Sequence, residues 1–320
     1  MSFLPELAPF AESGRLIYAH PDAKLPEHPA RPRIHIIGLG DVGMHCALGL
    51  RLLGGADLTL GLYARDHTTA EALSMELNQC APHTPVPMPR AVPVRKDQLL
   101  NCDALVFAAS AGVPKTLKPG DDVRMMQFEN NKKILSEYLS MLRSFEFSGT
   151  LFILSDPVDA LCAFAAKELA GVLPRERILG LGLGVMAARA AYYAYESAPE
   201  YLQEGRAYGP HGEGLWIANS IENYDDRRSE TLTEKAKTAN LAIRAKGQKP
   251  FYGPSIASGA WSLLHWVRGE WFYASIALDT VYFGCRVRRI GGLLQTEHRV
   301  VEKTLGARLD ETIEQLRRYV

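Results

Sequence analysis

The sequence predicts an α/β protein in which an N-terminal doubly wound parallel sheet is followed by a C-terminal mixed α+β part. Between residues 33 and 154, short apolar runs alternate with longer stretches of helical spacing. This alternation is typical of a parallel sheet that is covered by helices on both faces. After about residue 160 it loosens, and helical stretches are joined by glycine-rich segments. The two halves of the chain are therefore expected to differ in architecture.

The individual elements follow from the same periodicities. Strands are predicted at residues 33–37, 58–63, 104–109 and 151–154, and helices at residues 42–53, 68–79, 123–145 and 158–170. Later helices are predicted at residues 187–196, 231–245 and 258–267, and a last one begins near Ala307. A proline-rich stretch precedes the first strand, so residues 1–31 are interpreted as an N-terminal arm, loosely structured or lying on a partner subunit.

Composition and charge give no reason to expect a nucleic-acid or membrane partner. Lys+Arg and Asp+Glu both number 36 in 320 residues, so the formal net charge is zero. The basic run at residues 286–289 is interpreted as a solvated face. No apolar stretch approaches the roughly 20 residues of a membrane helix, and the N-terminus lacks the pattern of a signal peptide. A soluble, cytoplasmic protein is expected.

The cysteines do not suggest disulfides or a metal site. They are odd in number and widely spaced, and no pair has the spacing of metal ligands. Buried, reduced thiols are expected at Cys46, Cys80, Cys102, Cys162 and Cys285.

A glycine-rich turn follows the first predicted strand and opens the first predicted helix. Gly38, Gly40 and Gly43 form a GxGxxG pattern, with Asp41 and Val42 inside it. The first glycine permits a tight turn, the second lets the backbone approach a pyrophosphate, and the third lets helix and strand pack closely. Free N–H groups at the helix start favour the phosphates. The motif predicts a dinucleotide-binding Rossmann domain at residues 32–157, followed by a catalytic α+β domain at residues 158–320.

The end of the second predicted strand favours NADP(H) over NAD(H), with NAD(H) still possible. An NAD-specific site usually has an acidic residue there to accept hydrogen bonds from the ribose. Ala64 occupies that position, and the adjacent Arg65 can pair with a 2′-phosphate. The alternative is that Arg65 is solvated and Asp66 still reaches the ribose.

From about residue 33 to the C-terminus, the sequence resembles the lactate/malate dehydrogenase family. The matching segments occur in the family's order, and six ordered matches are more specific than any one of them. They are AEALSMELNQ (70–79), FAASAGVPK (107–115), Arg124 followed by NKKI (131–134), SDPVD (155–159), Arg189 after the glycines at 180–184, and GPHGE (209–213).

The resemblance implies hydride transfer between a nicotinamide and a 2-oxo/2-hydroxy acid. Arg189 would clamp the substrate carboxylate, Arg124 would polarise the carbonyl, and His211 would donate the proton. Lys115 and Asn131 are the further candidate substrate contacts, and Ala109 is a candidate cofactor contact. Aligned from the other end of its loop, the Lys115 position could instead be Leu117 or Lys118. Family members form dimers or tetramers, so a homo-oligomer is implied as well.

Two positions depart from the family pattern. Met186 stands where the family has the aspartate that orients the catalytic histidine, and Asp156 stands where it has an asparagine. If Asp156 has become the partner of His211, the two departures compensate each other, because one carboxylate is lost and one is gained.

Two other functions stay open at this point. Asp156 could instead hold a cationic nitrogen, which would make the protein an imine or opine-type reductase. Alternatively, Met186 could mark a catalytically weakened protein that retains only its nucleotide site.

Overall fold

The computed structural model describes residues 15–16, 31–112, 123–278, 281–290, 293–297 and 299–317. Most of the predicted arm at residues 1–31 lies outside these ranges. Lys115, Leu117 and Lys118, the candidates for the specificity position, also lie outside the described residues.

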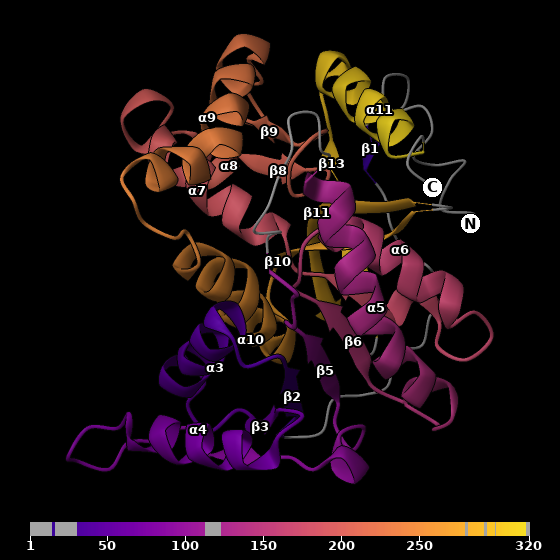
Figure 1. The fold of residues 1–320 in the computed structure, drawn as a ribbon. Helices are drawn as coiled ribbons and strands as arrows, with labels where there is room; N and C mark the ends of the chain where they lie inside the picture. Colours follow the sequence, from indigo (N-terminus) through magenta and orange to yellow (C-terminus); the bar gives the residue numbers. More distant parts are fainter. Residues whose placement is uncertain are drawn as a thin grey trace.

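A nine-stranded sheet runs through the molecule in the order β12-β11-β10-β7-β6-β5-β2-β3-β4 (Figure 1). Its parallel part consists of β2 (Arg33–Ile37), β3 (Thr59–Tyr63), β4 (Ala91–Pro93), β5 (Ala104–Phe107), β6 (Thr150–Ile153) and β7 (Ile178–Gly180). Taken in chain order, these strands have the 3-2-1-4-5-6 arrangement of a dinucleotide-binding fold. Every residue of β5 and β6 is buried, as expected for strands covered on both faces. The predicted Rossmann sheet is confirmed.

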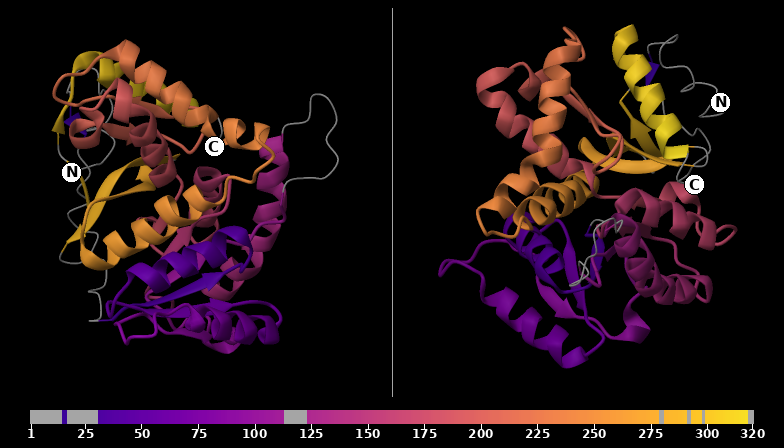
Figure 2. Two further views of the ribbon diagram at one scale, coloured as in Figure 1. Left: turned by 90° about the vertical axis from the view of Figure 1, so that its left-hand side faces the viewer. Right: turned by 45° about the horizontal axis from the view of Figure 1, so that its top comes forward.

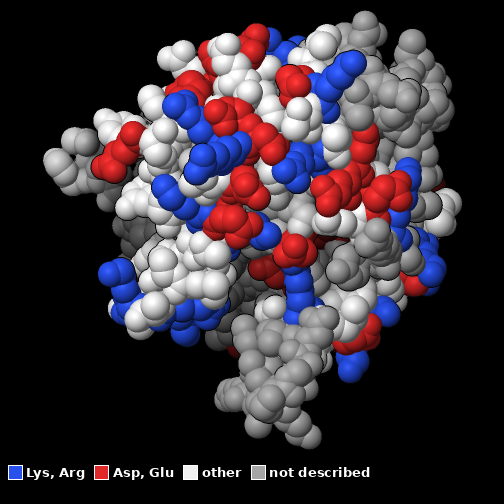
Figure 3. Space-filling model, turned by 90° about the horizontal axis from the view of Figure 1, so that it is seen from above, with Lys and Arg blue, Asp and Glu red and all other residues white. Residues whose placement is uncertain are grey.

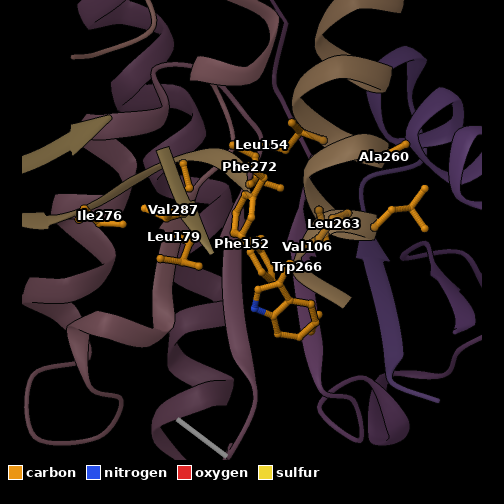
Figure 4. Close-up of a cluster of buried hydrophobic side chains, with 14 of the residues drawn as sticks. Val106, Phe152, Leu154, Leu179, Ala260, Leu263, Trp266, Phe272, Ile276 and Val287 are labelled. Carbon is orange, nitrogen blue, oxygen red and sulfur yellow. The ribbon is translucent and has the colours of Figure 1, made fainter. Parts of the chain in front are cut away.

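Helices cover both faces of the sheet (Figure 1). On one face lie α3 (Asp41–Leu53), the π-helical segment η3 (Pro254–Ala260) and α10 (Trp261–Arg268), and on the other lie α5 (Val123–Arg143) and α6 (Val158–Glu168). The helix α4 (His67–Gln79) contacts β3 and β4 near the sheet edge, and the short 3-10 helices are η1 (Lys96–Gln98) and η2 (Arg175–Arg177). Trp266 of α10 packs edge-to-face on Phe152 of β6, with ring centroids 5.1 Å apart (Figure 4).

The C-terminal half extends the sheet with antiparallel strands that the sequence did not predict. These strands are β10 (Phe272–Leu278), β11 (Val281–Ile290) and β12 (Leu293–Thr296), and β10 joins the parallel part by pairing with β7. Above the nucleotide-binding half (Figure 2) lie α7 (Leu183–Ser197), α8 (Tyr201–Glu204), α9 (Asp226–Ala245) and α11 (Lys303–Arg317). Small two-stranded sheets pair β8 (Arg206–Tyr208) with β9 (Trp216–Ala218) and β1 (Arg15–Leu16) with β13 (Arg299–Val300). The mixed α+β character of this half is confirmed.

Several local predictions were wrong, including the start of α9, which begins at Asp226 and not at residue 231. The basic run at 286–289 belongs to β11, where Val287 and Arg289 are only 0% and 6% exposed, so it is not a solvated face. The helix α7 begins at Leu183 and not at residue 187, so the glycine-rich segment contributes Leu183 and Gly184 to its first turn. Cys80 is exposed, whereas Cys46, Cys102, Cys162 and Cys285 are buried as expected; all five thiols are free.

The face shown in Figure 3 carries charged side chains of both signs. Acidic and basic side chains are interspersed over the face shown in Figure 3, without a large region of one sign. In the part of the chain that the structure describes, no helix has the length and apolarity needed to cross a membrane. Within the same residues, no group of three or more His, Cys, Asp or Glu side chains could hold a metal ion.

Candidate active site

The glycine-rich turn lies where the strand order reverses, between the carboxyl ends of β2 and β5. Gly38 has a φ of 90°, and a Cβ on it would lie 2.3 Å from the Ala109 nitrogen, so no other residue fits there. A Cβ on Gly43 would lie 1.9 Å from the Gly38 carbonyl oxygen. By contrast, Gly40 has open space around its Cα, with nothing within 4 Å of a Cβ position. This open side is where a pyrophosphate would approach the backbone.

The start of α3 is also suited to an anion. Gly40 is its N-cap residue and has no side chain to bond the first N–H groups of the helix. These N–H groups and the helix dipole are therefore available to the phosphates of a dinucleotide. Asp41 and Val42 form the first turn behind them. The residues present fit a dinucleotide cofactor.

A hollow of about 730 Å³ lies at the carboxyl end of β3, where the adenosine end of a dinucleotide would reach. Ala64 and Arg65 line it, together with Arg95 and Lys96. Asp66 is used elsewhere, because its carboxylate caps α4 by accepting hydrogen bonds from the Thr68 nitrogen (3.1 Å) and the Thr69 hydroxyl (2.8 Å). The hydrogen bonds from Thr69 and Thr68 hold the pKa of Asp66 below its usual value.

The imidazole of His211 is hydrogen-bonded to Asp156. The distance from His211 Nδ1 to Asp156 Oδ1 is 2.9 Å. Asp156 lies just after β6, and its backbone is fixed by Asn131, whose amide nitrogen donates to the Asp156 carbonyl oxygen at 2.6 Å. The amide oxygen of Asn131 accepts from the Ala111 nitrogen at 2.8 Å, and the side chain is only 1% exposed. Asn131 thus positions Asp156 and the loop after β5.

Asp156 is surrounded by cationic groups. Burial by itself would raise the pKa of its carboxyl, but the charge and hydrogen bond of His211 and the charges of Arg124 and Arg189 outweigh burial and lower it. The Asp156 side chain is 49% exposed, so its carboxylate is accessible from outside the core. The charges of the histidine and of both arginines that the sequence singled out therefore act on this one carboxylate.

Each arginine is held against a particular neighbour. The Arg124 guanidinium donates to the His211 carbonyl oxygen at 2.5 Å and lies directly over Gly212, where a Cβ would be 2.3 Å from Arg124 Nη1. Gly212 has a φ of 140°, so its backbone conformation favours glycine. Arg189 lies on α7, and its Nη1 is 3.3 Å from the Met186 sulfur.

Asp159 is a site residue to which the sequence assigned no role. It accepts a hydrogen bond from the His211 backbone nitrogen at 3.3 Å and another from the Ser275 hydroxyl, so it ties the histidine turn to strand β10. Burial raises the pKa of this carboxyl. Its position in the SDPVD run was a visible signal, but the sequence could not show that the side chain reaches His211.

Comparison with known proteins identifies the family and the fold. The family model described as "lactate/malate dehydrogenase, NAD binding domain" matches residues 32–180. The L-lactate dehydrogenase of Staphylococcus saprophyticus is 30% identical over 241 residues, which is 69% of this chain and 72% of that protein. L-lactate dehydrogenase 1 of Bacillus cereus is 29% identical over 212 residues, and the match spans 64% of its length.

Solved structures show the same fold. A lactate dehydrogenase from a deep-sea metagenome library has a TM-score of 0.73 at 22% identity, covering 91% of this chain and 98% of that one. The malate dehydrogenase of Archaeoglobus fulgidus, solved in complex with NADH, has a TM-score of 0.72 at 18% identity, with coverages of 90% and 98%. With its NAD-binding domain, its fold and its relative at 30% identity, the chain belongs to the lactate/malate dehydrogenase family.

Proposed function

We propose that the protein is an NADP(H)-preferring oxidoreductase that interconverts a 2-oxo acid and a 2-hydroxy acid, with Asp156 as the carboxylate partner of His211. The observation that carries this proposal is the 2.9 Å hydrogen bond between His211 Nδ1 and Asp156 Oδ1. It provides the orienting acid that Met186 lacks. A weakened nucleotide-binding protein would have no need for this replacement.

The side chains then have distinct tasks. Arg189 binds the substrate carboxylate through two parallel hydrogen bonds and so fixes the reacting carbon. Arg124 stabilises the negative charge that develops on the substrate oxygen. His211 donates a proton from Nε2 to that oxygen, while Asp156 accepts a hydrogen bond from Nδ1–H and stabilises the charged ring. A cofactor held by its pyrophosphate at the glycine-rich turn would supply or accept the hydride through its nicotinamide.

The exchange of residues preserves the charge of the site. The resemblance implies an aspartate on α7 and an asparagine after β6, and this chain has Met186 and Asp156 at these positions. One carboxylate is therefore still present. The carboxylate now comes from the β6–α6 junction, where Asn131 holds its backbone. Because Asp156 is already bonded to His211, a role as the binder of a cationic substrate nitrogen has less support.

The preference for NADP(H) rests on the adenosine hollow. Ala64 removes the usual carboxylate, and Asp66 is engaged in capping α4. Arg65, Arg95 and Lys96 line the hollow, so its walls carry positive charge that suits a 2′-phosphate. Arg95 also faces Asp97 at 3.4 Å, an exposed pair that contributes little and leaves the guanidinium able to rearrange.

A homodimer or homotetramer is part of the same proposal. Helix α7 carries Tyr192 and Tyr195, which are 77% and 74% exposed, and α9 carries Leu241 at 58%. Such exposed apolar side chains are often buried between subunits. Sedimentation or light scattering of the purified protein measures the state, and a monomer at assay concentration would contradict this part.

The activity is tested by following nicotinamide absorbance with NADPH or NADH and a panel of 2-oxo acids, each with and without ammonium. We expect turnover of at least one 2-oxo acid without ammonium, and a higher kcat/KM with NADPH than with NADH. Turnover only in the presence of an amine would replace this proposal with imine reduction. Tight cofactor binding without turnover of any 2-oxo acid would count against it.

A further inference from the structure

A second cavity, of about 1090 Å³, lies behind the catalytic side chains. Its walls come from α5, α6, the β10–β11 hairpin and α11. Arg124 and Asp159 line it and so connect it to the site described above, whereas His211, Asp156 and Arg189 are not among its described lining residues. It therefore adjoins the candidate active site and shares Arg124 and Asp159 with it. Cavities of this size commonly hold small molecules.

The wall formed by α6 and the turn after it is apolar and made of small side chains. Ala160, Ala163, Ala166 and Ala170 line the cavity. Because a methyl group occupies little volume, these alanines leave room for a ligand in the cavity. Phe164 of α6 and Phe128 of α5 also line the cavity, and they pack edge-to-face with ring centroids 6.5 Å apart.

The polar groups of the cavity are mainly cationic. Lys132 Nζ lies 5.5 Å and 5.1 Å from the ring centroids of Phe128 and Phe164. Lys167 follows Phe164 by three residues on α6, which is about one helical turn, and it also lines the cavity. Lys132 also faces Glu129 at 3.7 Å, but such an exposed pair is weak.

The acidic groups of the cavity are already engaged. Glu213 forms an ion pair with Lys237 at 3.5 Å. Asp159 is buried and accepts hydrogen bonds from the Ser275 hydroxyl and the His211 nitrogen. The cavity therefore combines an apolar wall with an excess of positive charge, which complements a molecule with an apolar chain and one negative end.

We propose that this cavity binds an amphipathic monocarboxylic acid, with its carboxylate at Lys132 and Lys167 and its apolar chain along the alanine wall of α6. Direct hydrogen bonds from two ammonium groups favour the carboxylate, and burial of the chain against Ala163, Phe164 and their neighbours supplies the rest of the affinity.

Occupancy of the cavity also acts on the catalytic groups. Arg124 lines the cavity and donates to the His211 carbonyl oxygen, so a bound chain constrains an arginine that faces the substrate. A change in the KM for the 2-oxo acid follows from this contact, and this consequence rests on the proposed function. Binding of the acid itself does not depend on the proposed function.

The test is isothermal titration calorimetry of the full-length protein with dodecanoate, with dodecan-1-ol and dodecyltrimethylammonium as the neutral and cationic analogues. We expect saturable binding of dodecanoate, and at least tenfold weaker binding of both analogues. The variant Lys167→Glu should weaken dodecanoate binding at least tenfold, because it places a negative charge at the carboxylate. Lys246→Glu, on an exposed lysine after α9, serves as the matched control.

A second variant tests the apolar wall. Ala170→Phe adds a ring at an exposed position of the wall and should also weaken binding, whereas Ala72→Phe on the exposed face of α4 should not. The proposal is overturned if dodecanoate shows no saturable binding, if the analogues bind equally well, or if Lys167→Glu and Ala170→Phe both bind like the unaltered protein. These binding results do not depend on turnover, so they separate a failure here from a failure of the proposed oxidoreductase activity.

Discussion

His211 obtains its carboxylate partner from the loop after β6 instead of from α7. The hydrogen bond between His211 Nδ1 and Asp156 Oδ1 places the acid where it can fix the tautomer and orientation of the ring. Replacing Asp156 with asparagine keeps the shape but removes the charge. We predict that Asp156→Asn lowers kcat by about 100-fold or more, in line with general acid–base contributions of that size.

Steady-state kinetics of Asp156→Asn should be compared with Asp57→Asn, which removes an exposed carboxylate paired with Arg268 far from the site. Unchanged kcat in Asp156→Asn, with circular dichroism showing an intact fold, would remove Asp156 from the mechanism.

The proposed preference for NADP(H) also depends on single residues. Arg65 lines the adenosine hollow, and the neighbouring Ala64 leaves the ribose side without a carboxylate. We predict that Ala64→Asp shifts the ratio of kcat/KM for NADPH over NADH by at least about tenfold toward NADH, since the new carboxylate repels a 2′-phosphate. Arg244→Ala, on the exposed surface of α9, should leave the ratio unchanged. A ratio that stays constant in Ala64→Asp would refute the assigned cofactor preference.

At the scale of elements, an ion pair joins β8 to the end of β12. Arg206 and Glu297 form two hydrogen bonds, at 2.5 and 2.6 Å, and their side chains are only 5% and 10% exposed. Removing one partner of a buried pair leaves the other charge uncompensated. We predict that Glu297→Ala lowers the free energy of unfolding by about 3–5 kcal/mol, measured by urea denaturation. Glu314→Ala, which removes an exposed pair with Arg317, should cost less than about 1 kcal/mol.

The same pair predicts a dependence of stability on pH. Burial alone would raise the pKa of Glu297, but the hydrogen bonds and charge of Arg206 outweigh burial and lower it from the usual 4.5. A carboxyl with a lowered folded-state pKa contributes stability above its unfolded pKa and loses it as the pH falls through the folded value. The stability lost between pH 6 and acid pH should therefore be smaller in Glu297→Ala than in the unaltered protein. Equal losses in both would contradict this assignment.

The elements that the sequence predicted well are those with one clear periodicity. β2, α3 and β3 were placed almost at their observed bounds, because a short apolar strand and an amphipathic helix are separated by glycines. The β10–β11 hairpin was missed because both faces of these strands are mostly buried, so their residues do not alternate between apolar and polar. The start of α7 was missed because Gly182 and Gly184 suggested a turn, whereas Gly184 lies against the Ala257 carbonyl, where a side chain would not fit.

The candidate site was predictable in composition but only partly in geometry. Arg124, Arg189 and His211 follow from the order of the family's motifs, and the exchange of Met186 for Asp156 suggested a compensating pair. The contact between Asp156 and His211 joins residues 55 positions apart and needed the fold. The roles of Asn131 and Asp159 as anchors of backbone depend on tertiary packing, which spacing does not reveal.

At the scale of the whole molecule, one sheet connects the two predicted domains. β6 of the first predicted domain pairs with β7 of the second, and Trp266 of α10 packs on Phe152 of β6 (Figure 4). The division at residues 157 and 158 stays a prediction, but this packing favours a single cooperative unit. We predict a single urea transition that coincides when it is followed by tryptophan fluorescence and by circular dichroism. In Phe152→Ala the free energy of unfolding should be lower by about 3–5 kcal/mol. Two separated transitions would show that the halves unfold independently.

The measurement that tests the central claim most directly is kcat for the double variant Asp156→Asn/Met186→Asp, compared with each single variant. It returns the carboxylate to α7, one turn before Arg189, where the family carries it. If the reaction needs a carboxylate beside His211, the kcat of the double variant should be at least about tenfold higher than the kcat of Asp156→Asn. If the double variant is no faster than Asp156→Asn although it folds and binds the cofactor, the exchange of the two residues is not a compensation, and the role assigned to Asp156 is wrong.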